Sequence, residues 1–445
     1  MNFLTDRIRP LYIRYLSAAF GSAFLSSIYS IVDMAMVGQY EGAAGTAAMA
    51  VVAPIWNIIV SLGLFMGVGG SVLFAAQRGR SRHRKGSENE YFTAAVIGSI
   101  ILCLLTWAGI VCFQKELLIF FGGDATLLPL AMTYLRPICF VLPVYLLNQT
   151  LAAFLRNDAH PLLATAAVLA GGLFNVFGDY FFVFAMDLGV FGAGLATAIG
   201  GCITFVILLS HFATKTNTLR IVPVSQLKHK LRRMMANGFS AFFIDCAMGL
   251  LTILFNRQIM KYLGADALAV YGPIINVSTF VQCCGYSVGQ AAQPILSVNY
   301  GAMKIDRVME TLRYALWTTL FFALFWTGLS LLFPDLYITI FMKPTPHILT
   351  IAPSIIRTYA LSFLLLPFNI FSTYYFQSIL RPGIAFVIAI ARGILISGTC
   401  IVLLPMLFGA DSIWLSMLIT ECLTASYCAC KMVRSAKKMQ RPKEG

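Results

Sequence analysis

The residues from Gly171 to Gly201, GGLFNVFGDYFFVFAMDLGVFGAGLATAIGG, read as two apolar helices joined by a short turn. Asn175 and Asp179 lie four residues apart on the first helix and therefore share one of its faces. Thr197 lies in the middle of the second helix. A carboxylate inside an apolar span is costly, so it usually marks an ion or proton site. The alternative is a buried Asp that serves only helix packing, through hydrogen bonds to Asn and Thr.

The whole chain has the composition of a membrane protein. Of its 445 residues, 59% are hydrophobic and only 11% are charged. Apolar runs of about twenty residues recur along the chain, which is the length that a helix needs to cross a bilayer. These runs do not alternate polar and apolar side chains, as the strands of a membrane barrel do. The sequence therefore predicts an all-α polytopic membrane protein.

We expect twelve transmembrane helices in two sets of six. The predicted spans lie at about 15–38, 46–74, 92–114, 127–151, 160–184 and 190–212, and then at about 236–256, 268–298, 313–333, 351–376, 383–406 and 412–432. A polar, basic stretch separates the two sets. The predicted domains are an amino-terminal six-helix lobe at 1–213, a cytoplasmic linker at 214–235, and a carboxyl-terminal six-helix lobe with a short basic tail at 236–445.

The positive charge follows the predicted loops. The formal net charge is +14, and 25 of the 32 Lys and Arg residues fall on one predicted face of the membrane, against six on the other. Cytoplasmic loops are the ones enriched in Lys and Arg, so we expect both termini to be cytoplasmic in a multi-pass protein of the cell membrane. A charge distributed in this way gives no reason to expect a nucleic-acid partner.

The two halves share an internal repeat. The segment GTAAMAVVAPIWN at 45–57 aligns without gaps with GADALAVYGPIIN at 264–276, and Pro54 and Pro273 correspond. Many transporters are built from such repeats, with their binding sites near the middle of the membrane. Because both halves have the same predicted orientation, we expect a parallel six-plus-six repeat and two pseudo-symmetric lobes.

Several motifs resemble those of the multidrug and toxic compound extrusion (MATE) transporters, over the chain from about Ser30 to Met432. The motifs are VDMAMVG at 32–38, the Gly-rich segment 63–79, NVFGD at 175–179 followed by GVFGAGLAT at 189–197, and QPI at 293–295 leading to NYG at 299–301. The resemblance implies a secondary active antiporter that exports amphipathic, often cationic drugs or toxic compounds. It implies alternating access driven by exchange for H⁺ or Na⁺, with no cofactor besides this coupling ion.

The same resemblance implies a cation-coupling site in the amino-terminal lobe. It would comprise Asp33, Asn175, Asp179 and Thr197, and Tyr134 matches a fourth-helix tyrosine of that network. Read from the residues alone, Asp33 and Asp179 are the only acids in the middle of the first-half spans. Such a pair can exchange a proton or ligate Na⁺ together with amide and hydroxyl oxygens, and the sequence leaves both possibilities open. We expect no other metal.

The second half lacks this site. By the correspondence of Pro161 with Pro382, Ile396 and Cys400 stand where the first half has Asn175 and Asp179. Charged residues occur elsewhere in the second-half spans. Asp245 has either a transport role or a local pairing and packing role. For Arg392 and Glu421, the prediction is a structural ion pair.

A wide, partly apolar substrate cavity is also predicted between the inner faces. We assign to it Asp245 together with Met34, Gln282, Tyr286, Gln290 and Tyr374. Met and aromatic side chains adapt to varied ligands, which suits a site for many substrates. The alternative for each residue is that it faces lipid or a neighbouring helix.

Three other functions are less consistent with the sequence. A flippase for a lipid-linked precursor needs cationic residues in its cavity, and only Arg392 lies deep in a span. A channel would need a selectivity filter, and none is visible. We do not expect an enzyme, since the five histidines are scattered over loops and helix ends. We expect a monomer that interacts with the lipid bilayer and with small-molecule substrates.

Overall fold

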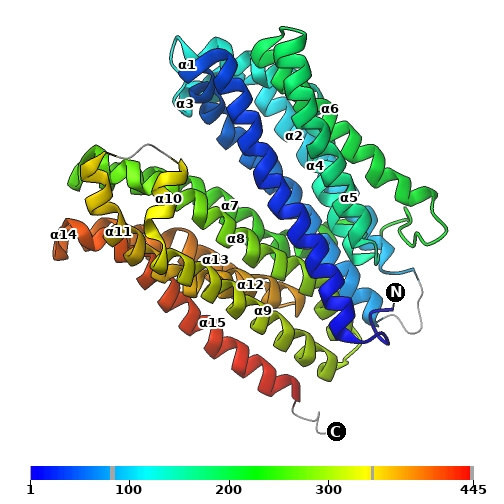
Figure 1. Ribbon diagram of the computed structural model, residues 1–445. Helices are drawn as coiled ribbons and strands as arrows, with labels where there is room; N and C mark the ends of the chain where they lie inside the picture. The colour runs from blue at the N-terminus through cyan, green and yellow to red at the C-terminus, as the bar shows by residue number, and fades with distance from the viewer. Residues whose placement is uncertain (1, 81–85, 342–344, 441–445) are drawn as a thin grey trace. The chain divides into compact units, whose positions relative to one another are not determined.

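The computed structural model describes residues 2–80, 86–341 and 345–440, and all regular structure in these ranges is helical (Figure 1). The predicted all-α class is confirmed. The helices of the first half are α1 (Ile8–Arg80), α2 (Asn89–Cys112), α3 (Gln114–Phe120), α4 (Leu127–Asn157), α5 (Pro161–Asp179) and α6 (Gly189–Ser210). The next helix, α7 (Leu227–Tyr262), contains the first predicted span of the second half. A π-helical turn, Tyr180–Ala185, continues α5, and a 3₁₀ turn, His211–Ala213, ends α6.

The second half repeats this pattern with more interruptions. After α7, its helices are α8 (Gly264–Gly301), α9 (Ile305–Leu332), α10 (Pro334–Phe341), α11 (Pro346–Ala360), α12 (Leu366–Ser378), α13 (Pro382–Ile390), α14 (Ile396–Phe408) and α15 (Ser416–Gln440). A π-helical turn, Ala391–Leu395, joins α13 to α14, and 3₁₀ turns occupy Leu361–Leu364 and Ala410–Leu415. Each π-helical turn therefore lies in the fifth span of its half.

The predicted twelve spans agree with the structure. Within the described ranges, eleven helical segments from Ala44–Arg80 onward are long and apolar enough to cross a bilayer. The part of α1 before Gly42 contains the predicted span 15–38. Gly42 has a φ of 68° and a ψ of −150°, so it breaks α1 into two helices between the first two predicted spans. Glycine tolerates this left-handed φ because it has no Cβ.

Two compact units divide the chain. The first contains Ser17–Asp245, and the second contains Phe3–Leu16 together with the chain from Cys246 onward. The stretch 214–235, predicted as a linker between lobes, lies with the first unit. The change from one unit to the other falls inside α7, which is a single helix from Leu227 to Tyr262.

The first unit is a bundle held together by close helix crossings. Its α4 packs against α2 and α6, and α6 packs against α5 (Figure 1). A Cβ added to Gly238 of α7 would overlap the carbonyl oxygen of Phe65, and one added to Gly69 would overlap that of Met234. Small residues at such crossings let membrane helices approach until their backbones touch. The core between α1 and α4 includes Val37, Ile55 and Leu142.

The second unit packs α8 against α9 and α12, around a core that includes Phe255, Tyr271 and Trp414. The start of the chain is fixed to this unit by backbone contacts. Asn299 Nδ2 and Arg307 Nη2 donate to the Phe3 carbonyl over 3.1 and 2.9 Å. These bonds explain why residues 3–16 belong with the second half of the chain.

Candidate coupling site

Four helices of the first unit bring the predicted coupling residues together. The Tyr134 hydroxyl of α4 donates to Asp33 Oδ2 of α1 over 2.8 Å. On α5, Asn175 Nδ2 lies 3.5 Å from Asp179 Oδ1, and it donates to Thr197 Oγ1 of α6 over 3.1 Å. Asp33 and Asp179 are close enough to interact electrostatically. All five predicted residues therefore belong to one polar cluster, the coupling cluster.

The glycine-rich sequence around Thr197 explains how this cluster forms. A Cβ on Gly194 would overlap the backbone carbonyl of Tyr134, so α6 touches α4 next to the tyrosine. A Cβ on Gly200 would lie 2.7 Å from the carbonyl oxygen of Gly171, so α6 touches α5 one turn before Asn175. Thr197 lies between these two crossings. Without side chains on these glycines, α6 comes close enough to α5 for the 3.1 Å bond between Asn175 and Thr197.

The coupling cluster contains more oxygen acceptors than donors. Asp33 is 7% exposed and Asp179 is fully buried. Asp33 Oδ1, Asn175 Oδ1 and Asp179 Oδ2 are buried and have no hydrogen-bond partner in the described chain. A buried acceptor without a donor costs free energy, and a buried charge costs more. Carboxylate and amide oxygens in this state fit a bound proton or Na⁺, which would supply the missing positive partner.

Two neighbouring features were not predicted. The Tyr145 hydroxyl donates to the Thr197 carbonyl, and its ring packs edge-on against Trp56. Tyr145 lies eleven residues, or about three turns, after Tyr134, so the sequence did place both on one face of α4. The π-helical turn at Tyr180–Ala185 follows Asp179 directly. Such turns are frequent at functional sites, but the apolar run YFFVFA gives no sequence signal for one.

The residues predicted for a substrate cavity divide between the two units. Met34 of α1, which is 41% exposed, and Asp245 of α7 belong to the first unit. In the second unit, Gln282 is buried, with its Nε2 3.4 Å from Ser278 Oγ. The remaining cavity residues are Tyr286 and Gln290 of α8 and Tyr374 of α12, and the rings of Tyr286 and Tyr374 pack edge-on. That these residues share one cavity stays a prediction.

The predicted ion pair of the second half is confirmed. Arg392 Nε lies 2.7 Å from Glu421 Oε1, and both side chains are buried. Asn369 Nδ2 donates to the other carboxylate oxygen over 2.6 Å. Arg392 belongs to the π-helical turn between α13 and α14. A cavity of about 20 Å³ adjoins the pair and is also lined by Gln282. This volume is enough for about one water molecule.

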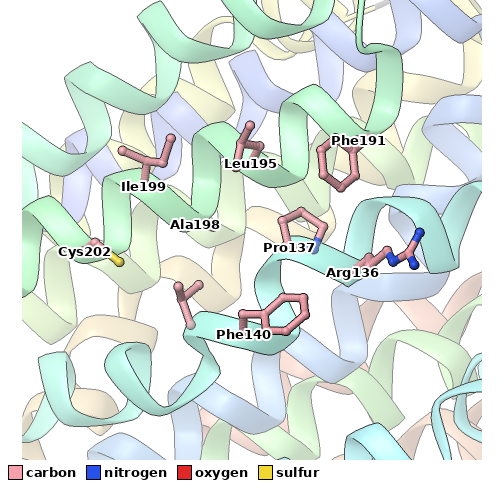
Figure 2. Close-up of a pocket in the computed structure, with 9 residues that line it drawn as sticks. Arg136, Pro137, Phe140, Phe191, Leu195, Ala198, Ile199 and Cys202 are labelled. Carbon is pink, nitrogen blue, oxygen red and sulfur yellow. The ribbon is translucent and has the colours of Figure 1, made fainter.

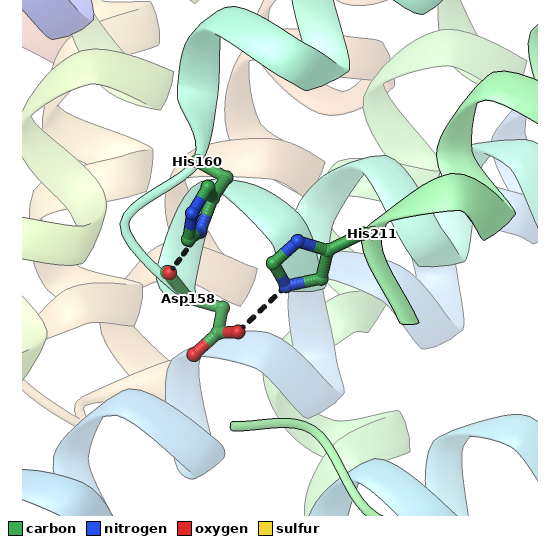
Figure 3. Close-up of side chains that lie close together, drawn as sticks. All are labelled: Asp158, His160 and His211. Carbon is green, nitrogen blue, oxygen red and sulfur yellow. Dashed lines mark hydrogen bonds and ion pairs between the residues drawn. The ribbon is translucent and has the colours of Figure 1, made fainter. Parts of the chain in front are cut away.

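A second polar cluster lies where α4 and α6 end, and the histidine positions had not suggested it. Asp158 is fully buried and accepts from Arg78 Nη1 over 2.9 Å and from His211 Nε2 over 2.8 Å (Figure 3). Its two oxygens also accept from the hydroxyl and the backbone N–H of Thr218. His160 Nδ1 is bonded to the Asp158 carbonyl over 2.7 Å (Figure 3). The ligand-type atoms of Asp158, His160 and His211 lie within 4.8 Å of one another. Both carboxylate oxygens already accept from protein donors, however, which favours a structural role.

The segment 214–226, which we call the strap, is attached to the first unit by this cluster and by further hydrogen bonds. Three of its backbone N–H groups donate to side chains of α2. Arg220 N–H donates to Asn89 Oδ1 over 3.1 Å, and Val222 N–H donates to Thr93 Oγ1 over 3.0 Å. Ser225 N–H donates to a carboxylate oxygen of Glu90 over 2.8 Å, and Lys230 Nζ pairs with the same oxygen. The strap is thus fixed along the first unit.

The fold and the coupling cluster define a class, the polytopic helical transporters built from two related halves. Comparison with known proteins identifies the family. The family model described as MatE matches residues 18–181 and 240–400. The chain therefore belongs to the MATE family of transporters.

Named relatives and solved structures agree with this assignment. The chain is 24% identical over 406 residues to the multidrug export protein MepA of Staphylococcus haemolyticus, covering 91% of this chain and 88% of that protein. The match to MepA of Staphylococcus saprophyticus, also 24% identical, covers 62% of this chain and spans 61% of that protein's length. The structure of a multidrug resistance MATE family transporter in an outward-facing conformation superposes with a TM-score of 0.90 at 18% identity, covering 99% and 98% of the two chains. This likeness shows the shared fold.

Proposed function

We propose that the protein is a secondary active antiporter that exports amphipathic, often cationic compounds in exchange for H⁺ or Na⁺. The observation that carries the proposal is the set of buried, unpartnered oxygens of Asp33, Asn175 and Asp179 in one unit. The names of the MepA relatives, multidrug export proteins, support the substrate class. On this proposal the protein works as a monomer.

The coupling follows from the free energy of those oxygens. A bound proton or Na⁺ removes most of the cost of burying the acid pair, so the two transport conformations differ in stability according to its occupancy. Moving a two-state balance from 1:99 to 99:1 takes about 5.5 kcal/mol. The cost of burying one charge in a membrane helix is about 2.5–3.5 kcal/mol on insertion scales. The cost of burying two such charges, about 5–7 kcal/mol, is therefore as large as the free energy that the shift requires.

The charged residues of the second-half spans favour drug export over lipid flipping. A flippase for a lipid-linked precursor would use cavity cations to hold pyrophosphate. Arg392 is already paired with Glu421, which leaves no net charge at that position. We assign Asp245 to the cavity wall, where its carboxylate would favour cationic substrates.

The test uses the purified protein in vesicles with a proton gradient and a sodium gradient imposed separately. We expect efflux of a cationic dye to depend on one gradient and to stop when that gradient is collapsed by an ionophore. An Asp245→Asn variant should then lose transport of cations more than of neutral compounds. Dye movement that is independent of both gradients would contradict the proposal.

A further inference from the structure

The first unit has a groove whose lining residues have no role in the proposed transport. It runs between α4 and α6 and has a volume of about 450 Å³ (Figure 2). Its lining includes Pro137 and Phe140 from α4 and Phe191 and Ala198 from α6, and its only charged lining residue is Arg136. This volume lies in the range of small-molecule sites, at about 300–1,000 Å³.

The close helix crossings form the floor of the groove. Gly194 of α6 lies against Tyr134 and Pro137, and Gly201 lies against the ring of Tyr145. Between these two contacts, Ala198 offers only a methyl group toward the groove. The aromatic side chains of Phe140 and Phe191 stand at its edge (Figure 2). The lining is therefore apolar except at Arg136.

Arg136 gives the groove a charged end. Its side chain is exposed and makes no hydrogen bond or ion pair within the described ranges. It lies nine residues after the start of α4, about 14 Å along the helix axis. The whole helix of 31 residues is about 46 Å long, which exceeds the roughly 30 Å of a hydrocarbon core. A long Arg side chain at this depth can reach the headgroup region, while Phe140 and Cys202 lie on the deeper side.

We propose that this groove binds an anionic phospholipid, with the phosphate at Arg136 and one acyl chain along Ala198 and Cys202. Phe140 is 79% exposed on a membrane-spanning helix, so the groove opens toward the acyl chains of the membrane. An unpaired guanidinium favours an anionic headgroup and disfavours a cationic drug. The groove borders the coupling cluster at Tyr134, but none of its lining residues belongs to that cluster.

The test measures lipid retained by the delipidated full-length protein after addition of dioleoylphosphatidylglycerol or dioleoylphosphatidylcholine, by native mass spectrometry. We expect phosphatidylglycerol to be retained about fivefold more, the factor that about 1 kcal/mol per basic residue at an anionic surface gives. Arg136→Gln should remove this preference, and Arg136→Lys should keep most of it. Ala198→Leu, which fills the groove, should lower retention of both lipids.

Lys115→Gln is the matched control, because Lys115 is an exposed basic residue of the same unit outside the groove lining. It should leave retention unchanged. Equal retention of the two lipids by the parent protein would overturn the proposal, as would an Arg136→Gln variant that behaves like the parent. A cationic dye that displaces phosphatidylglycerol from the parent but not from Ala198→Leu would assign the groove to drugs and would also overturn it.

Discussion

At the scale of single residues, the coupling cluster and the Arg392–Glu421 pair differ in how their buried carboxylates are hydrogen-bonded. Each places carboxylates in the buried interior of its unit. Glu421 receives a full set of partners from Arg392 and Asn369. Asp33 and Asp179 keep unpartnered oxygens. A carboxylate whose two oxygens both have protein donors gains little from a further cation, whereas one with an unpartnered oxygen gains a partner. The difference separates a structural charge from one suited to exchange.

Tyr134→Phe tests the hydrogen bond to Asp33. Hydrogen bonds to charged groups contribute about 1.5–3 kcal/mol, so its loss should shift the half-saturating concentration of the coupling ion about tenfold or more. The dependence of efflux on ion concentration measures this shift. Tyr337→Phe is the control, since that hydroxyl bonds to Ser330 at 2.7 Å in the other unit. Equal behaviour of the two variants would remove Tyr134 from the site.

Arg392→Gln should be strongly destabilising. It leaves Glu421 buried without its cation, and breaking a buried pair in this way costs about 3–5 kcal/mol. The double variant with Glu421→Gln should recover much of the loss, because no charge then remains buried. Thermal unfolding in detergent measures both. The exposed pair of His347 and Asp266, 3.7 Å apart, gives the comparison, and Asp266→Asn should change little. A double variant no more stable than Arg392→Gln alone would contradict the pairing argument.

At the scale of helices, the contacts made by glycine decide where the polar residues meet. Gly194 and Gly200 bring α6 against α4 and α5 on either side of Thr197. The sequence showed that these glycines cluster, but it did not show which backbone each one touches. The strap is a similar case, because its contacts join residues more than a hundred positions apart in the chain.

Gly194→Ala should separate α6 from α4. The new methyl group would overlap the Tyr134 carbonyl, and overpacking of this kind costs about 1–3 kcal/mol. We expect a lower unfolding temperature together with weaker ion dependence of transport. Gly109→Ala in α2 is the matched control, because nothing lies within 4 Å of its Cβ position. That variant should be neutral or slightly more stable. Similar losses in both would point to a general intolerance of alanine.

Asp158→Ala should release the start of the strap. The substitution removes the acceptor of Arg78, His211 and Thr218 together. Hydrogen exchange measured by mass spectrometry should then rise for the peptide containing Thr218, Arg220 and Val222. Asn89→Ala should raise exchange in the same peptide, because it removes the acceptor of the Arg220 N–H. Unchanged protection in both variants would show that other contacts hold the strap.

At the scale of the whole chain, the sequence predicted the spans, the repeat and the coupling residues, because each leaves a local signal. Long apolar runs mark spans, and Pro54 and Pro273 mark the repeat. Asn175 and Asp179 share a helix face by spacing alone. Three features could not be predicted: the burial of His211, the attachment of residues 3–16 to the second unit, and the two π-helical turns. They depend on contacts distant in sequence, to which local periodicity is insensitive. The cytoplasmic position of both termini stays a prediction.

The central claim is that Asp179 couples ion binding to export, and one variant tests it most directly. Asp179→Asn resembles the permanently protonated residue, so the purified variant should fold and bind a cationic dye with an affinity close to that of the parent. In vesicles it should fail to export the dye when the coupling gradient is imposed. Dye binding and gradient-driven efflux are measured side by side on the same preparation. Export at the parent rate with the parent ion dependence would contradict the account.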